Sequence, residues 1–267
     1  MLNSKEIVGK IRKQLKSNIE KRRLKPGLAV ILAGKNPGCL VYVKLKQIAA
    51  EQLGIRFEKF FFPSTASPRK IIGLIKKINK NKNIHGLIVQ IPLPKKINPD
   101  LLVRNISPEK DVDGFGPKTK FISPVHQAVL KLMEQSKKPF KNKKAVILGN
   151  SAIFTQSLKN ILVKKGIKTE ILYPWKNKLN ANKTKKADFL IAALNKPNFV
   201  KPSMVKRTAV VIDVGYNRIK GKPVGDVDPK VRSKTPWLSP VPGGIGPLTV
   251  VYLLKNVYLA AKKQNIC

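Results

Sequence analysis

The run Leu28-Ala29-Val30-Ile31-Leu32-Ala33 decides the fold class of this chain. An unbroken apolar run of this length is typical of a parallel strand that is buried on both faces. A turn at residues 34–38 follows, and then a helical pattern runs from about 41 to 52 and ends at Gly54. Strand, turn and helix in this order predict an α/β domain with a mostly parallel sheet.

The same alternation continues on both sides of this stretch. Residues 4–23 carry an apolar side chain about every four positions, which predicts a helix with one buried stripe. Downstream, the pattern predicts a strand at 57–62, a helix that starts at Ser67-Pro68, and a strand over 85–94 with a polar Gln90 inside it.

A second α/β unit is predicted from about residue 141. The expected strands are 145–149, 169–172, 189–193 and 209–215, with a helix from Ser151 to Gly166 after the first of them. This succession is typical of a dinucleotide-binding fold, where free amides at a helix N-terminus hold a diphosphate. Gly149 is the only glycine in the first turn, so the glycine fingerprint by itself is weak. Residues 239–249 predict a rigid ligand-facing loop, and a final helix is expected at 250–263.

Composition bounds the remaining possibilities. The chain has 267 residues, and no apolar run approaches the roughly 18 residues that a membrane helix needs. The N-terminal residues do not resemble a signal peptide, and the two cysteines offer no disulfide framework or metal cluster, so we expect a cytoplasmic protein without a metal. With 54 Lys and Arg against 14 Asp and Glu, the net charge is +40, but the lysines are spread evenly. The charge therefore predicts only non-specific nucleic-acid binding, and a lysine bias in the genome would give the same composition.

Three polar segments contain candidate site residues. Tyr42 and Lys46 are four apart on the predicted helix and share a face, but Tyr216 and Tyr258 also precede a lysine by four positions, so spacing alone does not choose between the pairs. Gln90 lies near the end of its strand, where such sheets bind ligands, or it bonds a neighbouring backbone group. The acidic residues of Lys110-Asp111-Val112-Asp113-Gly114 either bind a ligand or cap a turn.

Taken in order, these segments resemble the bifunctional methylenetetrahydrofolate dehydrogenase and methenyltetrahydrofolate cyclohydrolase family over nearly the whole chain. The motifs that carry the resemblance are Tyr42-x-x-x-Lys46, Gly86-Leu87-Ile88-Val89-Gln90-Ile91-Pro92-Leu93-Pro94, Lys110-Asp111-Val112-Asp113-Gly114-Phe115, Val211-Ile212-Asp213-Val214-Gly215, Val224-Gly225-Asp226-Val227 and Pro240-Val241-Pro242-Gly243-Gly244-Ile245-Gly246-Pro247-Leu248-Thr249.

The resemblance implies an N-terminal α/β folate domain at 1–122, a Rossmann-like domain at 123–248, a C-terminal helix at 249–267 that packs back on the first domain, and a catalytic cleft between the domains. It implies oxidation of 5,10-methylenetetrahydrofolate with NADP, or with NAD, followed by hydrolysis to 10-formyltetrahydrofolate. It also implies a homodimer, and the folate substrates are often polyglutamylated. The implied catalytic residues are Lys46, Tyr42, Gln90 and Asp113; further substrate-binding residues are Val89, Ile91, Pro242, Gly243 and Gly244; cofactor-binding residues are Gly149, Asn150, Ser151 and Tyr216.

The match is weakest at the cofactor turn. Compared with the family pattern, Thr155 replaces a glycine, Ser157 a proline, and Asn150 a frequent arginine; Tyr216 replaces an isoleucine, and Lys176 and Lys178 are alternative partners for a 2′-phosphate. Two alternatives follow: a cyclohydrolase that has lost its dehydrogenase step, and a basic nucleic-acid-binding protein on the same scaffold.

Two further substitutions stand near the expected site. His126 replaces a glycine and is expected to face solvent at the start of a helix. Cys39 replaces a serine and is expected to be a small substitution, not a nucleophile.

Overall fold

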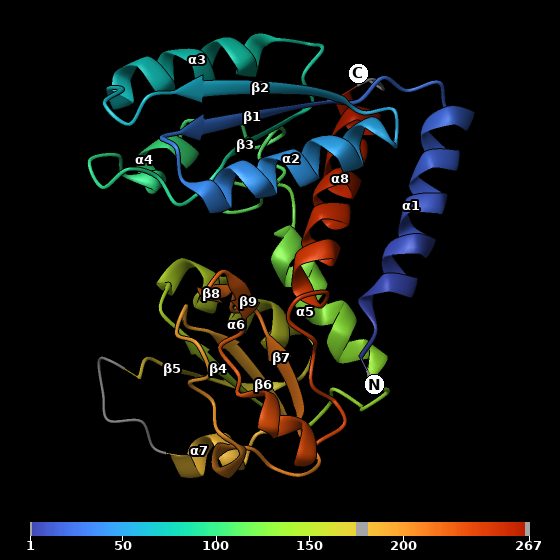
Figure 1. Cartoon of the computed structure of the whole chain (residues 1–267). Helices are drawn as coiled ribbons and strands as arrows, with labels where there is room; N and C mark the ends of the chain where they lie inside the picture. Colours follow the sequence, from blue (N-terminus) through green and yellow to red (C-terminus); the bar gives the residue numbers. More distant parts are fainter. Residues whose placement is uncertain (1, 175–180, 265–267) are drawn as a thin grey trace. The chain divides into compact units, whose positions relative to one another are not determined.

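The computed structural model describes residues 2–174 and 181–264 (Figure 1), and the contacts divide the chain into two compact units. The first unit consists of Val8–Pro124 and Thr249–Cys267, and the second of Val125–Leu248 and Met1–Ile7. The predicted α/β class with parallel sheets is confirmed in both. The domain boundaries at 122 and 248 stay a prediction.

The first unit is built on a three-stranded parallel sheet of order β2-β1-β3. Strand β1 lies in the middle of the sheet, and all seven of its residues are therefore buried, as its apolar run predicts. Helix α3 packs on one face of this sheet through Ile71, Ile75 and Ile78. The elements are α1 (Ser4–Lys21), β1 (Gly27–Ala33), α2 (Pro37–Glu51), β2 (Arg56–Phe62), α3 (Pro68–Lys80), β3 (Gly86–Val89), α4 (Pro99–Val103) and α8 (Ile245–Gln264).

Helix α8 returns to this sheet late in the sequence. Asn256 on α8 donates two hydrogen bonds, to the carbonyl of Val112 at 2.9 Å and to that of Ile122 at 3.0 Å. A side chain at Gly86 would collide with Val112 and Val257, so β3 needs glycine there to approach the helix.

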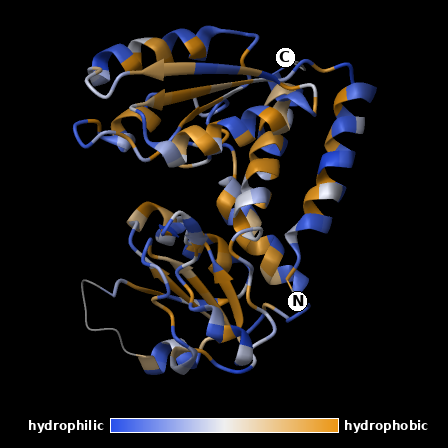
Figure 2. Cartoon of the chain, in the orientation of Figure 1, coloured by the Kyte–Doolittle hydropathy of each residue, from blue (hydrophilic) through white to orange (hydrophobic). Residues whose placement is uncertain are grey.

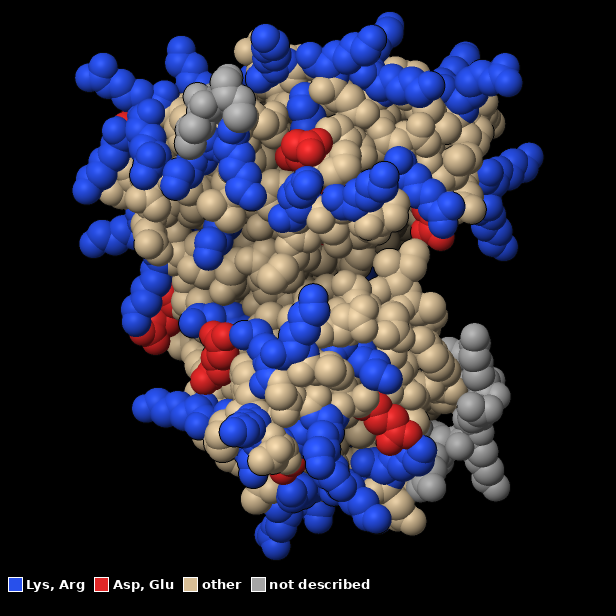
Figure 3. Space-filling model, turned by 180° about the vertical axis from the view of Figure 1, so that it is seen from behind, with Lys and Arg blue, Asp and Glu red and all other residues tan. Residues whose placement is uncertain are grey.

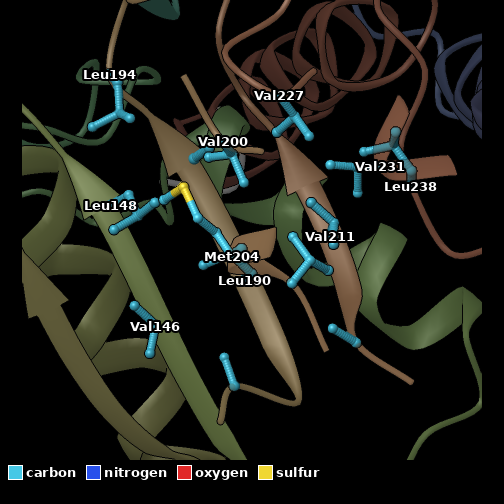
Figure 4. Close-up of a cluster of buried hydrophobic side chains, with 14 residues drawn as sticks. Val146, Leu148, Leu190, Leu194, Val200, Met204, Val211, Val227, Val231 and Leu238 are labelled. Atoms are coloured by element: carbon cyan, nitrogen blue, oxygen red, sulfur yellow. The ribbon is translucent and has the colours of Figure 1, made fainter. Parts of the chain in front are cut away.

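The second unit is a four-stranded parallel sheet of order β5-β4-β6-β7 with a small antiparallel hairpin, β8-β9. Its core is a cluster of aliphatic side chains from β4, β6 and β7 together with residues of the later loops, among them Met204 (Figure 4). The elements are α5 (Pro124–Gln135), β4 (Lys144–Gly149), α6 (Ala152–Lys164), β5 (Lys168–Leu172), α7 (Ala181–Lys185), β6 (Phe189–Ala193), η1 (Pro202–Met204), β7 (Val210–Asp213), β8 (Asn217–Ile219), β9 (Lys222–Val224) and η2 (Pro229–Ser233).

Several predicted boundaries are wrong for local reasons. Helix α2 begins at Pro37 and not near 41, because the Asn36 side chain caps it by accepting a hydrogen bond from the amide of Cys39. Strand β3 ends at Val89, since Pro92 and Pro94 lack the amides that a longer ladder needs. The predicted loop at 239–249 is correct only in its first half, because α8 already begins at Ile245.

Hydrophobic residues concentrate on the strands and the inward helix faces of each unit, with polar residues outside (Figure 2). In the described part of the chain, no helix is both long and apolar enough to span a membrane. The cytoplasmic location stays a prediction.

Candidate functional site

The sheet topology of the first unit puts three polar side chains at one edge. Strand β1 has β2 on one side and β3 on the other, so the chain reverses direction across the sheet at the carboxyl ends of β1 and β3. In parallel α/β sheets this switch point is where ligands bind. Lys46 comes from the helix after β1, Gln90 follows β3 directly, and Asp113 ends a segment in which Asp111 pairs in parallel with Leu87.

Lys46 and Gln90 are in direct contact. The Lys46 ammonium donates to Gln90 Oε1 at 2.8 Å, and Gln90 Nε2 donates to the carbonyl of Ile91, also at 2.8 Å. Gln90 therefore bonds a neighbouring backbone group, as one of the two expectations had it, and also contacts the lysine; its binding of a ligand stays a prediction. Lys46 shares the buried face of α2 with Cys39 and Val43, and only 9% of it is exposed.

Burial and mutual charge set the protonation of this cluster. Burial lowers the pKa of Lys46, and the nearby Asp113 carboxylate opposes that shift. Burial raises the pKa of Asp113, which Lys46 opposes and Asp111 reinforces. Both shifts favour the neutral forms, so the lysine can accept or release a proton far more easily than a solvated one.

The two acidic residues of the 110–114 segment differ in their contacts, and ligand binding by Asp113 stays a prediction. The carboxylate of Asp111 accepts hydrogen bonds from the amides of Gly114 at 3.1 Å and Gly116 at 2.7 Å, so it caps the turn. Asp113 is the half-buried carboxylate that interacts with Lys46. The sequence alone gave no reason to separate them.

Four further residues lie close in sequence to Lys46 or Gln90: Cys39, Tyr42, Val89 and Ile91. Tyr42 is half-buried one helical turn before Lys46, Val89 is buried at the end of β3, and Ile91 is 52% exposed. Cys39 is buried and donates through Sγ to the carbonyl of Pro92 at 3.6 Å. Burial raises the pKa of the Cys39 thiol, against the charge of Lys46, which agrees with the expectation that it is no nucleophile.

A second switch point lies in the second unit. Strand β4 has β5 on one side and β6 on the other, and Gly149 ends β4 there. Ser151 caps helix α6 by accepting from the amide of Phe154 at 3.4 Å. Asn150, Ser151 and Ala152 are exposed, and the first turn of α6 contains no acidic residue, so its free amides can receive an anion.

Comparison with known proteins gives the family to which both parts of the chain are similar. The family model "Tetrahydrofolate dehydrogenase/cyclohydrolase, catalytic domain" matches residues 2–113, and "Tetrahydrofolate dehydrogenase/cyclohydrolase, NAD(P)-binding domain" matches residues 123–265. The chain belongs to the tetrahydrofolate dehydrogenase/cyclohydrolase family.

Individual relatives agree over the full length. A protein of Halalkalibacterium halodurans, "Bifunctional protein FolD", is 38% identical over 98% of this chain and 99% of its own. The crystal structure of the bifunctional methylenetetrahydrofolate dehydrogenase/cyclohydrolase of Campylobacter jejuni has a TM-score of 0.92 at 34% identity, over 98% of both chains. The Trypanosoma brucei structure, complexed with NADP and an inhibitor, has a TM-score of 0.90 at 26% identity, covering 100% of this chain and 98% of that one.

Two buried carboxylates, Asp213 and Asp226, hold the loops of the second unit together, and we call this pair the clamp. The sequence did not reveal it. Asp213 accepts from the amides of Gly215, Asp226 and Val227, each at 3.0 Å. Burial raises the pKa of Asp213 to about 7, against these amides. Asp226 in turn accepts from the amides of residues 194–196 and from the Asn217 side chain at 2.9 Å. The clamp fixes the loops that follow β6 and β7, on the same edge of the sheet as Gly149.

The remaining predicted residues also lie in the second unit. Tyr216 is 38% exposed beside the clamp. Pro242 and Gly243 are exposed and Gly244 is buried; the Ser4 hydroxyl donates to the carbonyl of Gly243. Their role in a folate site stays a prediction. Lys176 and Lys178 lie outside the described residues.

The prediction for His126 is wrong. Its side chain is fully buried and not solvent-facing, with Nε2 3.1 Å from the carbonyl oxygen of Phe154. The two rings also touch, with centroids 4.9 Å apart. The signal in the sequence was the apolar run that follows on α5, which places the helix start inside the unit.

Proposed function

We propose that this chain oxidises 5,10-methylenetetrahydrofolate to the 5,10-methenyl form and then hydrolyses that product to 10-formyltetrahydrofolate. The family match over both parts of the chain supports the pair of reactions. The single observation that carries the chemistry is the 2.8 Å contact between Lys46 and Gln90 at the switch point of the first unit.

Lys46 is the proposed proton-transfer group. Hydrolysis adds water to a cationic methenyl carbon, and the attacking water must lose a proton as its oxygen bonds to carbon. A buried lysine with a lowered pKa has the neutral form that can take this proton. Gln90 Oε1 accepts an N–H of Lys46 and so fixes the direction of the remaining nitrogen sites.

Asp113, Tyr42 and the loop at 242–244 are proposed to hold the folate. Asp113 is an acceptor at the same edge of the sheet, suited to the N–H groups of a pterin. Tyr42 offers a half-buried ring one turn from Lys46, on which a flat heterocycle can stack. Pro242, Gly243 and Gly244 would complete the substrate site with backbone groups.

The second unit fits a nicotinamide dinucleotide at the α6 turn. When bound, the nicotinamide ring accepts the hydride that leaves the methylene carbon. The first-turn amides of α6 would face the diphosphate, with Gly149, Asn150 and Ser151 lining the turn before them, and Tyr216 would lie beside this turn. We favour NADP over NAD, because no acidic residue stands between Glu170, inside β5, and Asp188, so no carboxylate follows β5 to hold a ribose 2′-hydroxyl.

Absorbance of the methenyl chromophore tests both reactions. The protein would receive methylenetetrahydrofolate with NADP or NAD, and separately methenyltetrahydrofolate alone. Cofactor-dependent formation and cofactor-independent decay are both expected. Decay without formation would support the cyclohydrolase-only alternative, which the substitutions at Asn150 and Thr155 first suggested. Absence of both reactions would overturn the proposal.

Lys46→Met has a matched control two residues away. Lys46→Met should slow the cyclohydrolase step at least about 100-fold, because proton transfer then depends on solvent. Lys44→Met removes an exposed lysine of the same helix and should leave the rate unchanged. Equal loss in both variants would refute the assignment.

We also propose a homodimer through the outer surface of the first unit. Helix α2 exposes Leu40, Val41, Leu45 and Ile48, each 39–51% accessible, and β2 is an edge strand with Phe61 48% exposed. Exposed apolar patches and open strand edges are usually covered. Light scattering should give twice the 29.7 kDa chain mass for the wild type. Leu45→Lys should give the mass of one chain, whereas Leu101→Lys, at an exposed leucine of α4, should keep the mass of two.

The positive surface is proposed to attract polyglutamylated folates. Lys and Arg spread over the face in Figure 3 with few acidic residues between them, and they form no single basic stripe. Such a field raises association with any polyanion and is screened by salt. The KM for a polyglutamylated substrate should therefore rise with salt more steeply than that for the monoglutamate.

A further inference from the structure

Two side chains from other elements, and one from the turn itself, hold the start of α6 in the second unit. Tyr173, just after β5, places its hydroxyl 2.8 Å from Thr155 Oγ1. His126 on α5 places Nε2 3.1 Å from the carbonyl oxygen of Phe154. Asn150 Nδ2 donates to the carbonyl of Leu194, after β6, at 2.9 Å.

The direction of the Tyr173 hydrogen bond follows from the partners of Thr155. Thr155 is fully buried, and its hydroxyl donates to a backbone carbonyl, that of Ser151 at 2.9 Å or of Ala152 at 3.3 Å. A hydroxyl has one hydrogen, so Tyr173 is the donor and Thr155 the acceptor. Removing the tyrosine hydroxyl therefore leaves no buried donor without a partner.

Thr155 also fixes the spacing of the turn. A side chain at Gly149 would come within 2.2 Å of Thr155 Cγ2, so the threonine methyl packs directly against the glycine that ends β4. Between them, residues 150–152 are exposed, and α6 begins at Ala152 with first-turn amides that have no acceptor within the helix. A shift of Thr155 would therefore move the amides that an anion meets.

Resting on the proposed dehydrogenase step, we propose that Tyr173 and His126 are positioning residues for the nicotinamide dinucleotide. They touch Thr155 and Phe154, not the cofactor, and they hold the amides of the α6 turn at the diphosphate. Preorganised donors bind an anion more tightly than donors that must be ordered on binding.

The test measures the Kd for NADP by calorimetry with Tyr173→Phe and a matched Tyr258→Phe control on α8 in the first unit. Loss of one neutral hydrogen bond predicts a Kd about fivefold higher for Tyr173→Phe, equal to about 1 kcal/mol. Tyr258→Phe should bind like the wild type, and the cofactor-independent hydrolysis should be unchanged in both. Amide hydrogen exchange in the α6 turn should be faster in Tyr173→Phe alone.

His126 supplies a conservative rescue. His126→Phe keeps an aromatic ring against Phe154 but removes the nitrogen, so its Kd for NADP should rise. His126→Gln keeps a donor that can reach the same carbonyl, so it should restore most of the affinity.

The outcomes separate this inference from the proposed function. Wild-type protein that binds no dinucleotide would overturn the dehydrogenase proposal and this inference together. Wild-type binding with an unchanged Kd in Tyr173→Phe would overturn this inference alone. A parallel loss of hydrolysis and binding would also overturn it, because that result indicates general unfolding.

Discussion

Acidification should destabilise the second unit through His126. The side chain is 0% exposed, and burial lowers its pKa from 6.5 to about 4, against a hydrogen bond with the Phe154 carbonyl. The unfolded chain takes up a proton below about pH 6.5, whereas the folded chain takes it up only near pH 4. The contribution of His126 to stability is therefore complete above pH 6.5 and is lost as the pH falls from about 6.5 to about 4.

The expected loss is large enough to measure. One proton taken up only by the unfolded chain changes the free energy of unfolding by about 1.4 kcal/mol per pH unit. The free energy of unfolding should fall by about 2 kcal/mol at pH 5 and by about 3 kcal/mol at pH 4. The His126 side chain has no solvent exposure that would reduce this effect.

Urea unfolding followed by tryptophan fluorescence is the suitable assay. Trp237 lies in the same unit as His126, and the other tryptophan, Trp175, lies outside the described residues, so the Trp237 signal is the one that reports this unit. His126→Gln can keep the bond to Phe154 without titrating. The difference in unfolding free energy between pH 7 and pH 5 should be about 2 kcal/mol smaller in His126→Gln than in the wild type. Equal differences in the two proteins would refute the reasoning.

Three other substitutions each test the contacts of one buried side chain. Asp226→Asn should lower the unfolding free energy by about 3 kcal/mol in urea titrations, because an amide cannot accept from all the buried donors that the carboxylate now satisfies. Lys110→Met removes the ammonium that donates to two carbonyls at the C-terminus of α3, at 2.9 and 2.6 Å, and should cost about 2 kcal/mol by thermal unfolding, whereas the exposed Lys118→Met should cost nothing. Cys39→Ser should keep cyclohydrolase activity within about threefold, because the serine hydroxyl can replace the thiol as donor to Pro92; a larger loss would contradict that assignment.

Continuous apolar runs gave the parallel strands correctly. Strands β1, β4 and β6 are buried almost throughout, so their sequences are continuous apolar runs, a pattern that differs from the polar sequences of loops. The β8-β9 hairpin was missed because its strands have three residues each and are mostly exposed. The predicted start of a helix was wrong where one capping side chain determines it, as Asn36 does for α2.

The site shows a different limit of sequence reasoning. A tyrosine precedes a lysine by four positions at three places in the chain, and spacing alone does not choose between them. The place of Lys46 after the first strand, with Gln90 and Asp113 following in order, selects it. The choice between Asp111 and Asp113 depends on which carboxylate meets the amides of the turn, and that is a property of tertiary geometry. The prediction for His126 failed because it rested on the position of the histidine at a helix start and not on the apolar residues that follow it on α5.

The altered cofactor turn is best understood as a set of replacements that support each other. A turn released from function should accumulate side chains that leave buried polar groups without partners. Here Thr155 is fully buried yet bonded to Tyr173, and Asn150 is bonded to the backbone after β6. His126 is buried against Phe154 on the same turn. Thr155, Asn150 and His126 each have a partner within the second unit, and this favours the bifunctional enzyme over a cyclohydrolase with a decayed dinucleotide site.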